Sequence, residues 1–251
     1  MSLIQSLKNK FTQYTGLHIY KKRPFGLDSI EDLKYYFEDL SFKTIFDVGA
    51  NIGQTAIHIR NNFPTADIWS FEPVKNTFNI LTKNTSGLNI NCQQMALGSS
   101  MGEIMLATNE AERPSTMNSL LNNHFNSENA NEHIKVLTLD SFCVSNSIEK
   151  IDLLKIDTEG FDLEVLKGAS KFLTDQSIDF VEVEVGMNPE NTYHVNFVEV
   201  KQFLENFDYR LYGLYEQIHE WQTNKPILRR VNALYISKAI YNNGKKHKIQ
   251  L

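Results

Sequence analysis

Short apolar segments alternate with amphipathic helical segments through the middle of this chain of 251 residues. The clearest pair is TIFDVG at 44–49, which reads as a strand, and the helical stretch at about 54–62 that follows it. The run IDLLKID at 151–157 is almost continuously apolar, as expected for a parallel strand that is buried on both faces. This alternation predicts right-handed βαβ units and therefore an α/β protein with an open parallel sheet.

The same patterns predict the remaining elements. Further strands are expected at 68–72, 90–98, 102–108, 135–139 and 179–185, and further helices at 27–40, 74–84, 160–173 and 196–207. Ser29 and Asp32 are expected to form a capping box at the start of the first helix. The segments YRLYGLY at 209–215 and VNALYIS at 231–237 have no helix between them, so they are predicted to pair as antiparallel strands at one edge of the sheet.

Composition excludes several classes of protein. The chain is 41% hydrophobic, which is enough for a large core, and its two cysteines rule out a disulfide scaffold or a cysteine-based zinc site. The sequence contains no run of about 18 apolar residues, so no transmembrane helix is predicted. The first residues, MSLIQSLKNKF, do not read as a signal peptide, so a cytoplasmic protein is expected.

Charge is distributed unevenly along the chain. The net charge is −5, but residues 1–24 and 238–251 carry only basic charges, so the region between them is strongly acidic. An acidic core is a poor general binder of nucleic acid and favours a cationic ligand. Leu3, Leu7 and Phe11 fall at helical spacing beside lysines, which leaves weak contact with a membrane surface as an alternative to packing on the main domain.

The chain divides into three parts by pattern. Residues 1–43 are expected to be an N-terminal helical extension, 44–237 the main domain, and 238–251 a basic tail. Within the domain, residues 109–134 are polar and rich in asparagine. An insert of this length inside a compact domain is typical of a lid, a binding loop or a disordered segment. A lid is predicted here, and a floppy insertion with short helical turns is the alternative.

A turn that contains two glycines is the sharpest candidate site. Asp47 ends the first strand, and Gly49 and Gly53 would let the backbone turn tightly and approach a ligand closely. Asn51 replaces the middle glycine of the dinucleotide motif G-x-G-x-x-G, which argues against NAD. An acid at position 47 would repel a phosphate, and it suits a ligand with an amino or sulfonium group.

A second acid, Glu72, ends the next strand in the sequence Phe71-Glu72-Pro73. A carboxylate at this place can accept hydrogen bonds from the ribose hydroxyls of an adenosine. Together with Asp47 and the glycine turn, it predicts a site for a nucleoside that carries a positive charge, which describes S-adenosylmethionine. The alternative interpretation is that Asp47 caps the helix and Glu72 is a surface acid.

Charged residues also gather at the end of the most apolar strand. Lys155 and Asp157 face the same side by strand alternation, so they are expected to pair, and Glu159 follows closely. Glu182 and Glu184 share one face of the next strand. Such charges are costly to bury unless they line a polar cleft.

In this order, the motifs resemble the FkbM family of class I S-adenosylmethionine-dependent methyltransferases. The resemblance covers about residues 44–237 and rests on TIFDVGANIGQT (44–55), WSFEPVKNTFNILTKN (69–84), ALG (96–98), TLDSF (138–142) and IDLLKIDTEGFDLEVLKGA (151–169). The last segment is the most specific to the family. It departs from the family pattern at Phe161-Asp162, where a small residue followed by Glu is more usual.

The resemblance implies a Rossmann-like class I methyltransferase fold, with a seven-stranded, mostly parallel sheet and an antiparallel edge strand. It implies an O-methyltransferase that methylates a hydroxyl of a sugar, a glycan or a glycosylated metabolite with S-adenosyl-L-methionine as cofactor. It places Asp140 at the border of the reaction cleft. The cofactor-binding residues that it implies are Asp47, Gly49, Ala50, Asn51, Gly53, Gln54, Thr55, Glu72, Pro73, Ala96, Leu97 and Asp157.

A sugar hydroxyl is a weak nucleophile, so a general base is expected. Asp157 is the first candidate, and Glu159 and Glu184 come next. Lys155 is expected either to fix the Asp157 carboxylate or, if burial lowers its pKa, to act as a neutral base. Asp157, Glu159 and Glu184 are also oxygen ligands of the kind that Mg²⁺ prefers, but they form no definite ligand set and no metal is predicted.

Two alternatives remain from the sequence. One is a non-catalytic binding protein that kept the methyltransferase fold, and the other is an NAD-dependent enzyme of the doubly wound type. The histidines at 124, 133 and 194 could approach an acceptor, although surface positions are more typical of them. The acceptor, the hydroxyl that is methylated and the oligomeric state stay open.

Overall fold

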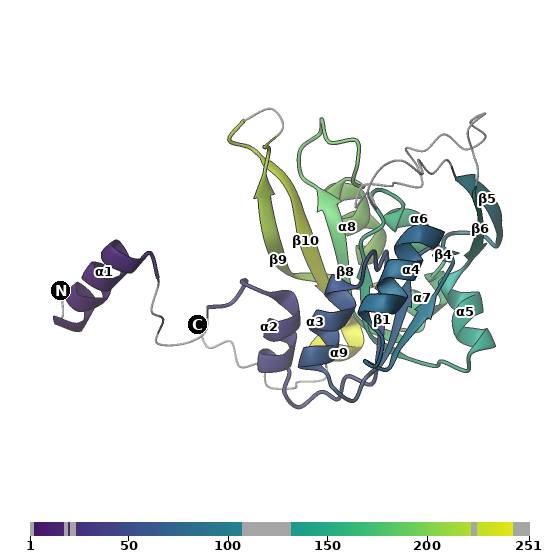
Figure 1. The fold of residues 1–251 in the computed structure, drawn as a ribbon, viewed down its shortest axis with the longest axis horizontal. Helices are drawn as coiled ribbons and strands as arrows, with labels where there is room; N and C mark the ends of the chain where they lie inside the picture. The colour runs from purple at the N-terminus through teal and green to yellow at the C-terminus, as the bar shows by residue number, and fades with distance from the viewer. Residues whose placement is uncertain (1–2, 18–19, 21–23, 107–131, 222–224, 243–251) are drawn as a thin grey trace.

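The computed structural model describes residues 3–17, 20, 24–106, 132–221 and 225–242. Its centre is a seven-stranded sheet with the order β3-β2-β1-β7-β8-β10-β9 (Figure 1). The strands of this sheet are β1 Thr44–Val48, β2 Asp67–Phe71, β3 Ile90–Gln93, β7 Ile151–Ile156, β8 Ile178–Gly186, β9 Arg210–His219 and β10 Leu228–Ile236. The first five strands in this order are parallel, and β10 runs antiparallel to both β8 and β9. The predicted sheet, with its antiparallel pair at one edge, is confirmed.

The strand order reverses at β1, which has β2 on one side and β7 on the other. In open α/β sheets the crevice for a ligand lies at such a reversal, outside the carboxyl ends of the strands. The glycine turn after β1 and the charged residues after β7 therefore meet at the same edge.

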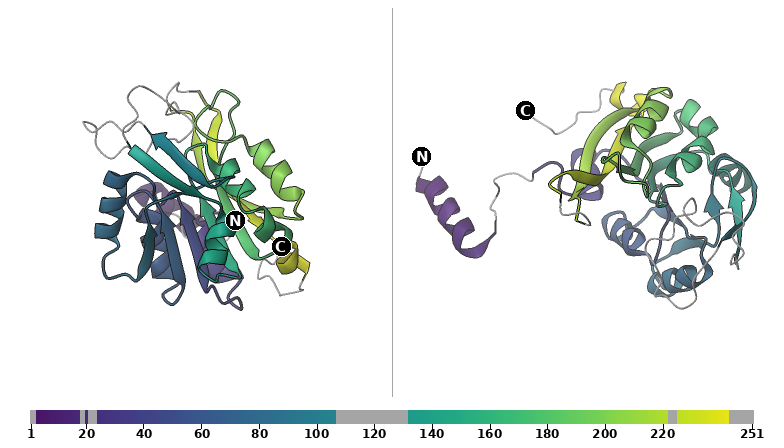
Figure 2. Two further views of the ribbon diagram at one scale, coloured as in Figure 1. Left: turned by 90° about the vertical axis from the view of Figure 1, so that its right-hand side faces the viewer. Right: turned by 90° about the horizontal axis from the view of Figure 1, so that it is seen from above.

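Helices cover both faces of the sheet (Figure 2). One face packs Ile45 and Leu153 against α2 Ser29–Tyr36, α3 Gln54–Asn62 and α9 Lys238–Asn242. The other packs Phe46 and Leu154 against α5 Leu139–Ser145, α6 Asp162–Lys167, α7 Ser170–Thr174 and α8 Phe197–Glu205. Helix α4 Lys75–Asn84 packs beside β3, and α1 Leu3–Thr15 lies apart from the sheet in Figure 1. Alternate residues of the central strands thus pack into two separate hydrophobic cores, one on each face of the sheet.

The expected single strand at 90–98 is wrong, because it divides between two sheets. β3 ends at Gln93, where the backbone N–H of Met95 bonds back to the Gln93 carbonyl at 3.1 Å and turns the chain. The next residues form β4 Ala96–Leu97 in a small sheet of order β4-β6-β5, with β5 Gly102–Leu106 and β6 Glu132–Leu137. This turn carries Ala96 and Leu97 over the carboxyl end of the main sheet.

Two helix predictions also need correction. The helix at 160–173 is divided by Gly168, because the Asp140 carboxylate accepts the backbone N–H groups of Lys171 and Phe172 and so begins α7 as a new helix. Asp140 therefore caps a helix, and it does not border the cleft. In α2 the N-cap is Asp28, whose side chain accepts the Glu31 N–H at 2.8 Å, so the Ser29 capping box is wrong.

Most of the predicted lid lies outside the described residues, which resume at Glu132, where β6 begins. Of the predicted basic tail, residues 238–242 form α9 and the rest is likewise outside them. On α1, Leu7 and Phe11 are exposed. None of the described helices is both long and apolar enough to cross a membrane.

Candidate functional site

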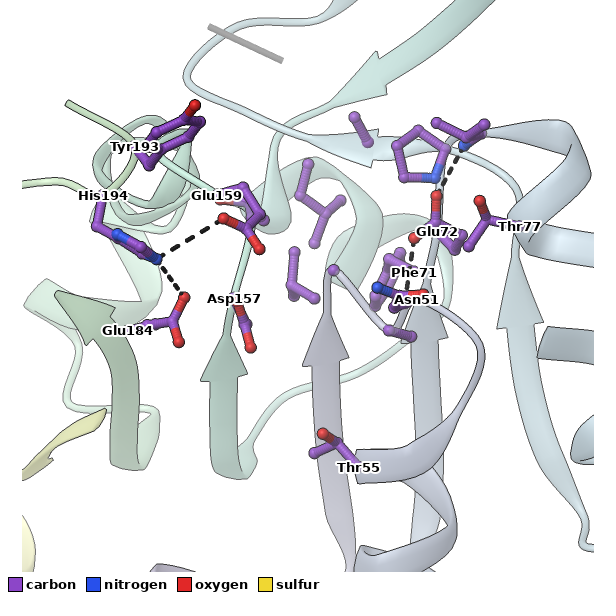
Figure 3. A pocket seen from close by; sticks show the side chains of 18 of the residues that line it. Asn51, Thr55, Phe71, Glu72, Thr77, Asp157, Glu159, Glu184, Tyr193 and His194 are labelled. Carbon is purple, nitrogen blue, oxygen red and sulfur yellow. Dashed lines mark hydrogen bonds and ion pairs between the residues drawn. The ribbon is translucent and has the colours of Figure 1, made fainter. Parts of the chain in front are cut away.

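A cavity of about 370 Å³ lies at the carboxyl ends of the central strands (Figure 3). Among its lining residues are many that the sequence singled out: Gly49, Ala50, Asn51, Gln54, Thr55, Glu72, Pro73, Ala96, Leu97, Asp157, Glu159 and Glu184. They come from the turn after β1, the end of β2, strand β4, the segment after β7 and the end of β8. The structure thus brings the glycine turn, Glu72 and the carboxylates that follow β7 and end β8 to one cavity.

Close approach of two backbones fixes the glycine turn. Gly49 has φ +84°, and a Cβ there would lie 1.9 Å from the carbonyl oxygen of Asp157. The N–H groups of Gly49 and Ala50 both donate to the Phe71 carbonyl, at 3.0 and 2.9 Å. The turn is thereby tied to both neighbouring strands, and only a glycine fits at its first position.

Glu72 is buried at the wall of the cavity and is held by the backbone. Its carboxylate accepts the N–H of Val74 at 2.9 Å and the N–H of Asn51 at 3.1 Å, through different oxygens (Figure 3). Burial raises the pKa of Glu72 to about 7, although these two hydrogen bonds oppose the rise. A carboxylate oxygen can accept more than one hydrogen bond, so both oxygens keep capacity for a ligand.

A row of charges lies beneath the cavity across three strands. Asp47 on β1 is opposite Lys155 on β7, and Lys155 is opposite Glu182 on β8. Asp47 is only 2% exposed and is absent from the cavity wall. Burial raises the pKa of Asp47 to about 7, in spite of the opposing charge of Lys155. Asp47 therefore lies behind the turn and does not reach the cavity.

Lys155 connects this buried row to the cavity. Its ammonium nitrogen lies 3.7 Å from a carboxylate oxygen of Asp157 and 3.7 Å from one of Glu182, so the predicted pairing with Asp157 is confirmed. Burial alone would lower the pKa of Lys155, but the carboxylates of Asp157, Glu182 and Asp47 outweigh it and raise the pKa. A lysine held as a cation favours the role of fixing Asp157 over that of a neutral base.

The opposite wall of the cavity carries a histidine between two acids. His194 Nε2 lies 2.8 Å from Glu184 and 3.7 Å from Glu159 (Figure 3). Burial lowers the pKa of His194, although Glu159 opposes this, and burial raises the pKa of Glu159 to about 6 with a further contribution from Asp157. One ligand atom from each of these three residues lies within 4.8 Å of the others, a spacing that could hold a metal ion.

Residues from the β9–β10 hairpin and the loop after β8 complete the mouth. Tyr193, Trp221, Arg229 and Arg230 line the cavity, and Trp221 is 66% exposed. Arg229 pairs with Glu220 at 3.1 Å and lies over the Tyr193 ring, with its guanidinium carbon 5.7 Å from the ring centre. Arg230 pairs with Glu184.

Sequence reasoning did not select these four mouth residues, and it named His194 only among several histidines. A signal was present in the pair Arg229-Arg230 at the start of the apolar strand β10, since a buried arginine needs a nearby acid. His133 lies on β6 beside Glu103 and is exposed, away from the cavity. His124 is outside the described residues.

Three predicted site residues do not line the cavity. Asp47 and Lys155 lie behind it, in the buried row of charges. Gly53 has φ +97° and begins α3, where a Cβ would meet the Leu81 side chain of α4 at 3.0 Å. Gly53 thus lets two helices pack closely, and its predicted role in cofactor binding is indirect.

Comparison with known proteins identifies relatives of this chain. The family model described as "Methyltransferase FkbM domain" matches residues 47–211. The hexuronic acid methyltransferase AglP of Haloferax volcanii is 32% identical over 156 residues, which are 59% of this chain and 58% of AglP. The methyltransferase sdnD of Sordaria araneosa is 29% identical over 157 residues, 51% of this chain and 60% of sdnD. The matches thus span about three fifths of these two relatives.

Solved structures show a weaker likeness. M. capricolum TrmK, solved with S-adenosyl-homocysteine, gives a TM-score of 0.46 at 14% identity, over 78% of this chain and 62% of that one. Magnesium protoporphyrin IX methyltransferase from Synechocystis PCC 6803, solved with S-adenosylmethionine, also gives 0.46, at 9% identity and over 93% and 98% of the two chains.

Proposed function

Because this chain belongs to the FkbM methyltransferase family, we propose that it transfers a methyl group from S-adenosylmethionine to a hydroxyl of a carbohydrate or glycosylated metabolite. The observation that carries the proposal is Glu72 at the end of β2, held by two backbone N–H groups in the wall of the cavity that contains the glycine turn. A fixed carboxylate in this position suits the two hydroxyls of a ribose.

The other cavity residues fit the rest of the cofactor. The backbone of Gly49 and Ala50 lines the cavity, and the absence of a side chain at position 49 lets this turn lie against the backbone of Asp157. Ala96 and Leu97 supply an apolar surface of the kind that a nucleobase needs. Asp157 is the carboxylate that would face a sulfonium. The cofactor supplies a methyl group that the positive sulfur already makes electrophilic.

Catalysis then depends on alignment and on removal of a proton. Asp157 is partly exposed, follows directly on a strand that is buried along its whole length and is paired with Lys155 at 3.7 Å. Lys155 fixes the orientation of this carboxylate, so that Asp157 accepts the proton of the acceptor hydroxyl as the oxygen attacks in line. Lys155 is accordingly a positioning residue, and Asp157 is the base.

The mouth of the cavity supports a sugar as acceptor. Trp221 presents an exposed ring, and Arg229 and Arg230 line the same cavity. An aromatic ring packs against the C–H face of a sugar, while charged donors bind its hydroxyl or carboxylate groups. AglP is named for the methylation of a hexuronic acid, which is consistent with a carbohydrate acceptor that carries a carboxylate.

Calorimetric titration tests the cofactor first. The wild-type protein should bind S-adenosylmethionine and S-adenosylhomocysteine but not NAD. Glu72→Gln should weaken binding of both adenosyl ligands by roughly 10- to 100-fold, because hydrogen bonds to a charged group contribute about 1.5–3 kcal/mol. Glu103→Gln is the matched control, since Glu103 is an exposed acid on β5. A folded wild-type protein that binds neither ligand would refute the proposal.

Turnover distinguishes the enzyme from a binding protein that kept the fold. Formation of S-adenosylhomocysteine should be measured with hexuronic acid glycosides and with the matching neutral glycosides. Cofactor binding without turnover on either set would favour the non-catalytic alternative. NAD binding would instead support a dehydrogenase of the doubly wound type.

A further inference from the structure

His194, Glu159 and Glu184 point toward one another in the wall of the cavity, and they come from three different segments of the chain (Figure 3). His194 lies in the loop after β8, Glu184 on β8 itself, and Glu159 in the turn after β7. The side chains of His194 and Glu184 are 6% and 5% exposed, so both are ordered by packing. From this convergence we infer that Glu159, Glu184 and His194 bind a divalent first-row transition metal.

The separations fit one ion with several ligands. Nε2 of His194 lies 2.8 Å from an oxygen of Glu184 and 3.7 Å from an oxygen of Glu159, and all three atoms fall within 4.8 Å. Ligands about 2.1 Å from a metal lie about 3.0 Å apart when adjacent in an octahedron and about 4.2 Å apart when opposite. The two measured separations, 2.8 and 3.7 Å, are close to the value for adjacent ligands and lie below the value for opposite ligands.

Neighbouring groups hold two of the three ligands in place. His194 Nδ1 lies 3.2 Å from the side-chain oxygen of Asn191, an acceptor for Nδ1–H, and this tautomer leaves Nε2 unprotonated and directed at the acids. The Arg230 guanidinium holds one oxygen of Glu184, and the other oxygen is the one that faces His194. Outer partners of this kind, on the far nitrogen of a histidine and the far oxygen of a carboxylate, are characteristic of protein metal sites.

The charge of the cavity favours a cation at this wall. The described lining carries four carboxylates, those of Glu72, Asp157, Glu159 and Glu184, against the two guanidinium groups of Arg229 and Arg230. Arg229 is paired with Glu220, outside the lining, so it compensates little of this charge, whereas Lys155 compensates Asp157 from behind the wall. A sulfonium would supply one positive charge, which leaves an excess of carboxylate that a divalent ion would neutralise.

The ligand types indicate the class of metal. One imidazole with two carboxylates is a mixed nitrogen and oxygen set, which suits Mn²⁺, Fe²⁺ or Zn²⁺ better than the oxygen-only preference of Ca²⁺. Three protein ligands leave positions open for a substrate oxygen. A hydroxyl bound there would lose its proton more readily to Asp157. This role in catalysis rests on the proposed methyltransferase function, whereas binding of the metal does not.

Titration with Mn²⁺ alone, in the absence of cofactor and acceptor, tests the site. Loss of the free Mn²⁺ signal in electron paramagnetic resonance should show one bound ion per chain, and electron spin echo modulation should show a coupled ¹⁴N from imidazole. His194→Ala should abolish the ¹⁴N coupling and weaken binding about 100-fold, and Asn191→Ala should weaken it about tenfold. The fold of each variant is checked by thermal unfolding.

His133→Ala is the matched control, because His133 also lies near a glutamate, Glu103 at 3.9 Å, but on the exposed surface of β6. It should leave Mn²⁺ binding unchanged. Glu159→Gln removes a ligand charge without a change of size, so it keeps the test decisive if His194→Ala does not fold. The inference is overturned if wild type binds no Mn²⁺, if bound Mn²⁺ shows no ¹⁴N coupling, or if Glu159→Gln and His133→Ala weaken binding equally.

Failure of the metal site and failure of the proposed function give different results. A protein that binds Mn²⁺ at His194 but no S-adenosylmethionine would keep this inference and refute the methyltransferase proposal. A protein that binds S-adenosylmethionine and methylates an acceptor, but binds no Mn²⁺ in the titration, would refute this inference and keep the methyltransferase proposal. If His194→Ala abolishes turnover while wild type binds no metal, His194 acts as a general base instead.

Discussion

The two ends of the cavity are built in different ways. At one end, Glu72 and the glycine turn come from strands in the middle of the sheet, and the backbone makes most of the contacts. At the other end, His194, Trp221 and Arg230 come from a loop and a hairpin beyond β8, and long side chains make the contacts. The first end depends on how closely two strands approach, and the second depends on which side chains the loops carry.

This difference predicts which changes the protein tolerates. A backbone contact between β1 and β7 cannot be altered without moving the sheet, so changes at the Glu72 end should affect folding and cofactor binding together. Side chains at the His194 end can be shortened while the sheet stays intact. Changes there should weaken binding of the acceptor and leave binding of the cofactor unchanged.

Gly49→Ala is expected to have the largest effect. The new Cβ would lie 1.9 Å from the Asp157 carbonyl oxygen, at a φ of +84° that alanine rarely adopts, so β1 and β7 must separate. We expect a loss of more than about 3 kcal/mol in the free energy of unfolding and no detectable binding of S-adenosylmethionine. Urea denaturation and calorimetry measure the two quantities.

Gly87→Ala provides the control for Gly49→Ala. Gly87 has a similar φ of +79°, but no atom lies within 4 Å of the position that a Cβ would take. Only the backbone penalty applies, so about 1 kcal/mol should be lost and cofactor binding should be unchanged. Equal costs for the two variants would show that the approach of β1 to β7 is not what fixes the turn.

Lys155→Met should have the next largest effect, because it leaves Asp47 and Glu182 buried without a cation. Breaking a buried ion pair in this way costs about 3–5 kcal/mol. Burial raises the pKa of Asp47 to about 7, so at pH 6 this acid binds a proton and the loss should be smaller than at pH 8. Urea denaturation at both pH values measures the difference.

Lys150→Met is the control for Lys155→Met. Lys150 also pairs with a buried acid, Asp179 at 2.6 Å, but its own side chain is 54% exposed. Water can replace it, so the loss should stay below about 1 kcal/mol. A loss at Lys150 as large as at Lys155 would mean that burial of the cation does not determine the cost.

Much of the fold and of the Glu72 end could be predicted because both follow from local sequence patterns. Apolar runs fix the strands, and an acid or a glycine directly after a run must lie at the carboxyl edge of a parallel sheet. Asp47 shows the limit of this argument, since the sequence places it at the end of β1 but does not reveal that it lies opposite Lys155 and behind the turn.

The His194 end could not be predicted in the same way. His194 follows β8 by eight residues, and Trp221 lies just beyond β9, so neither is tied to a strand end by a fixed spacing. Their meeting depends on the path of two loops, which no periodicity encodes. The break between β3 and β4 was missed for a related reason, because apolar residues continue through a turn that only a backbone hydrogen bond reveals.

Trp221→Ala tests the separation of the two ends directly. If the exposed ring packs on a sugar, its loss should raise the KM of the acceptor about tenfold, which corresponds to about 1.4 kcal/mol. The dissociation constant of S-adenosylmethionine should not change, because the ring lies at the mouth of the cavity. A parallel loss of cofactor affinity would mean that the two ends are not independent.

The smallest expected effect is a pH dependence at the Glu72 end. Burial raises the pKa of Glu72 to about 7 in the free protein, so the carboxyl group gains a proton as the pH falls below neutrality. A protonated carboxyl accepts hydrogen bonds from ribose hydroxyls less well, so S-adenosylmethionine should bind about fourfold more weakly at pH 6.5 than at pH 8. Asp47 has a similar pKa but lies behind the turn, so it should contribute little to this change. Calorimetry with Glu72→Gln separates the two acids. This variant should bind S-adenosylmethionine more weakly and equally well at both pH values. A pH dependence that persists in the variant would assign the effect to Asp47 and to the buried row of charges.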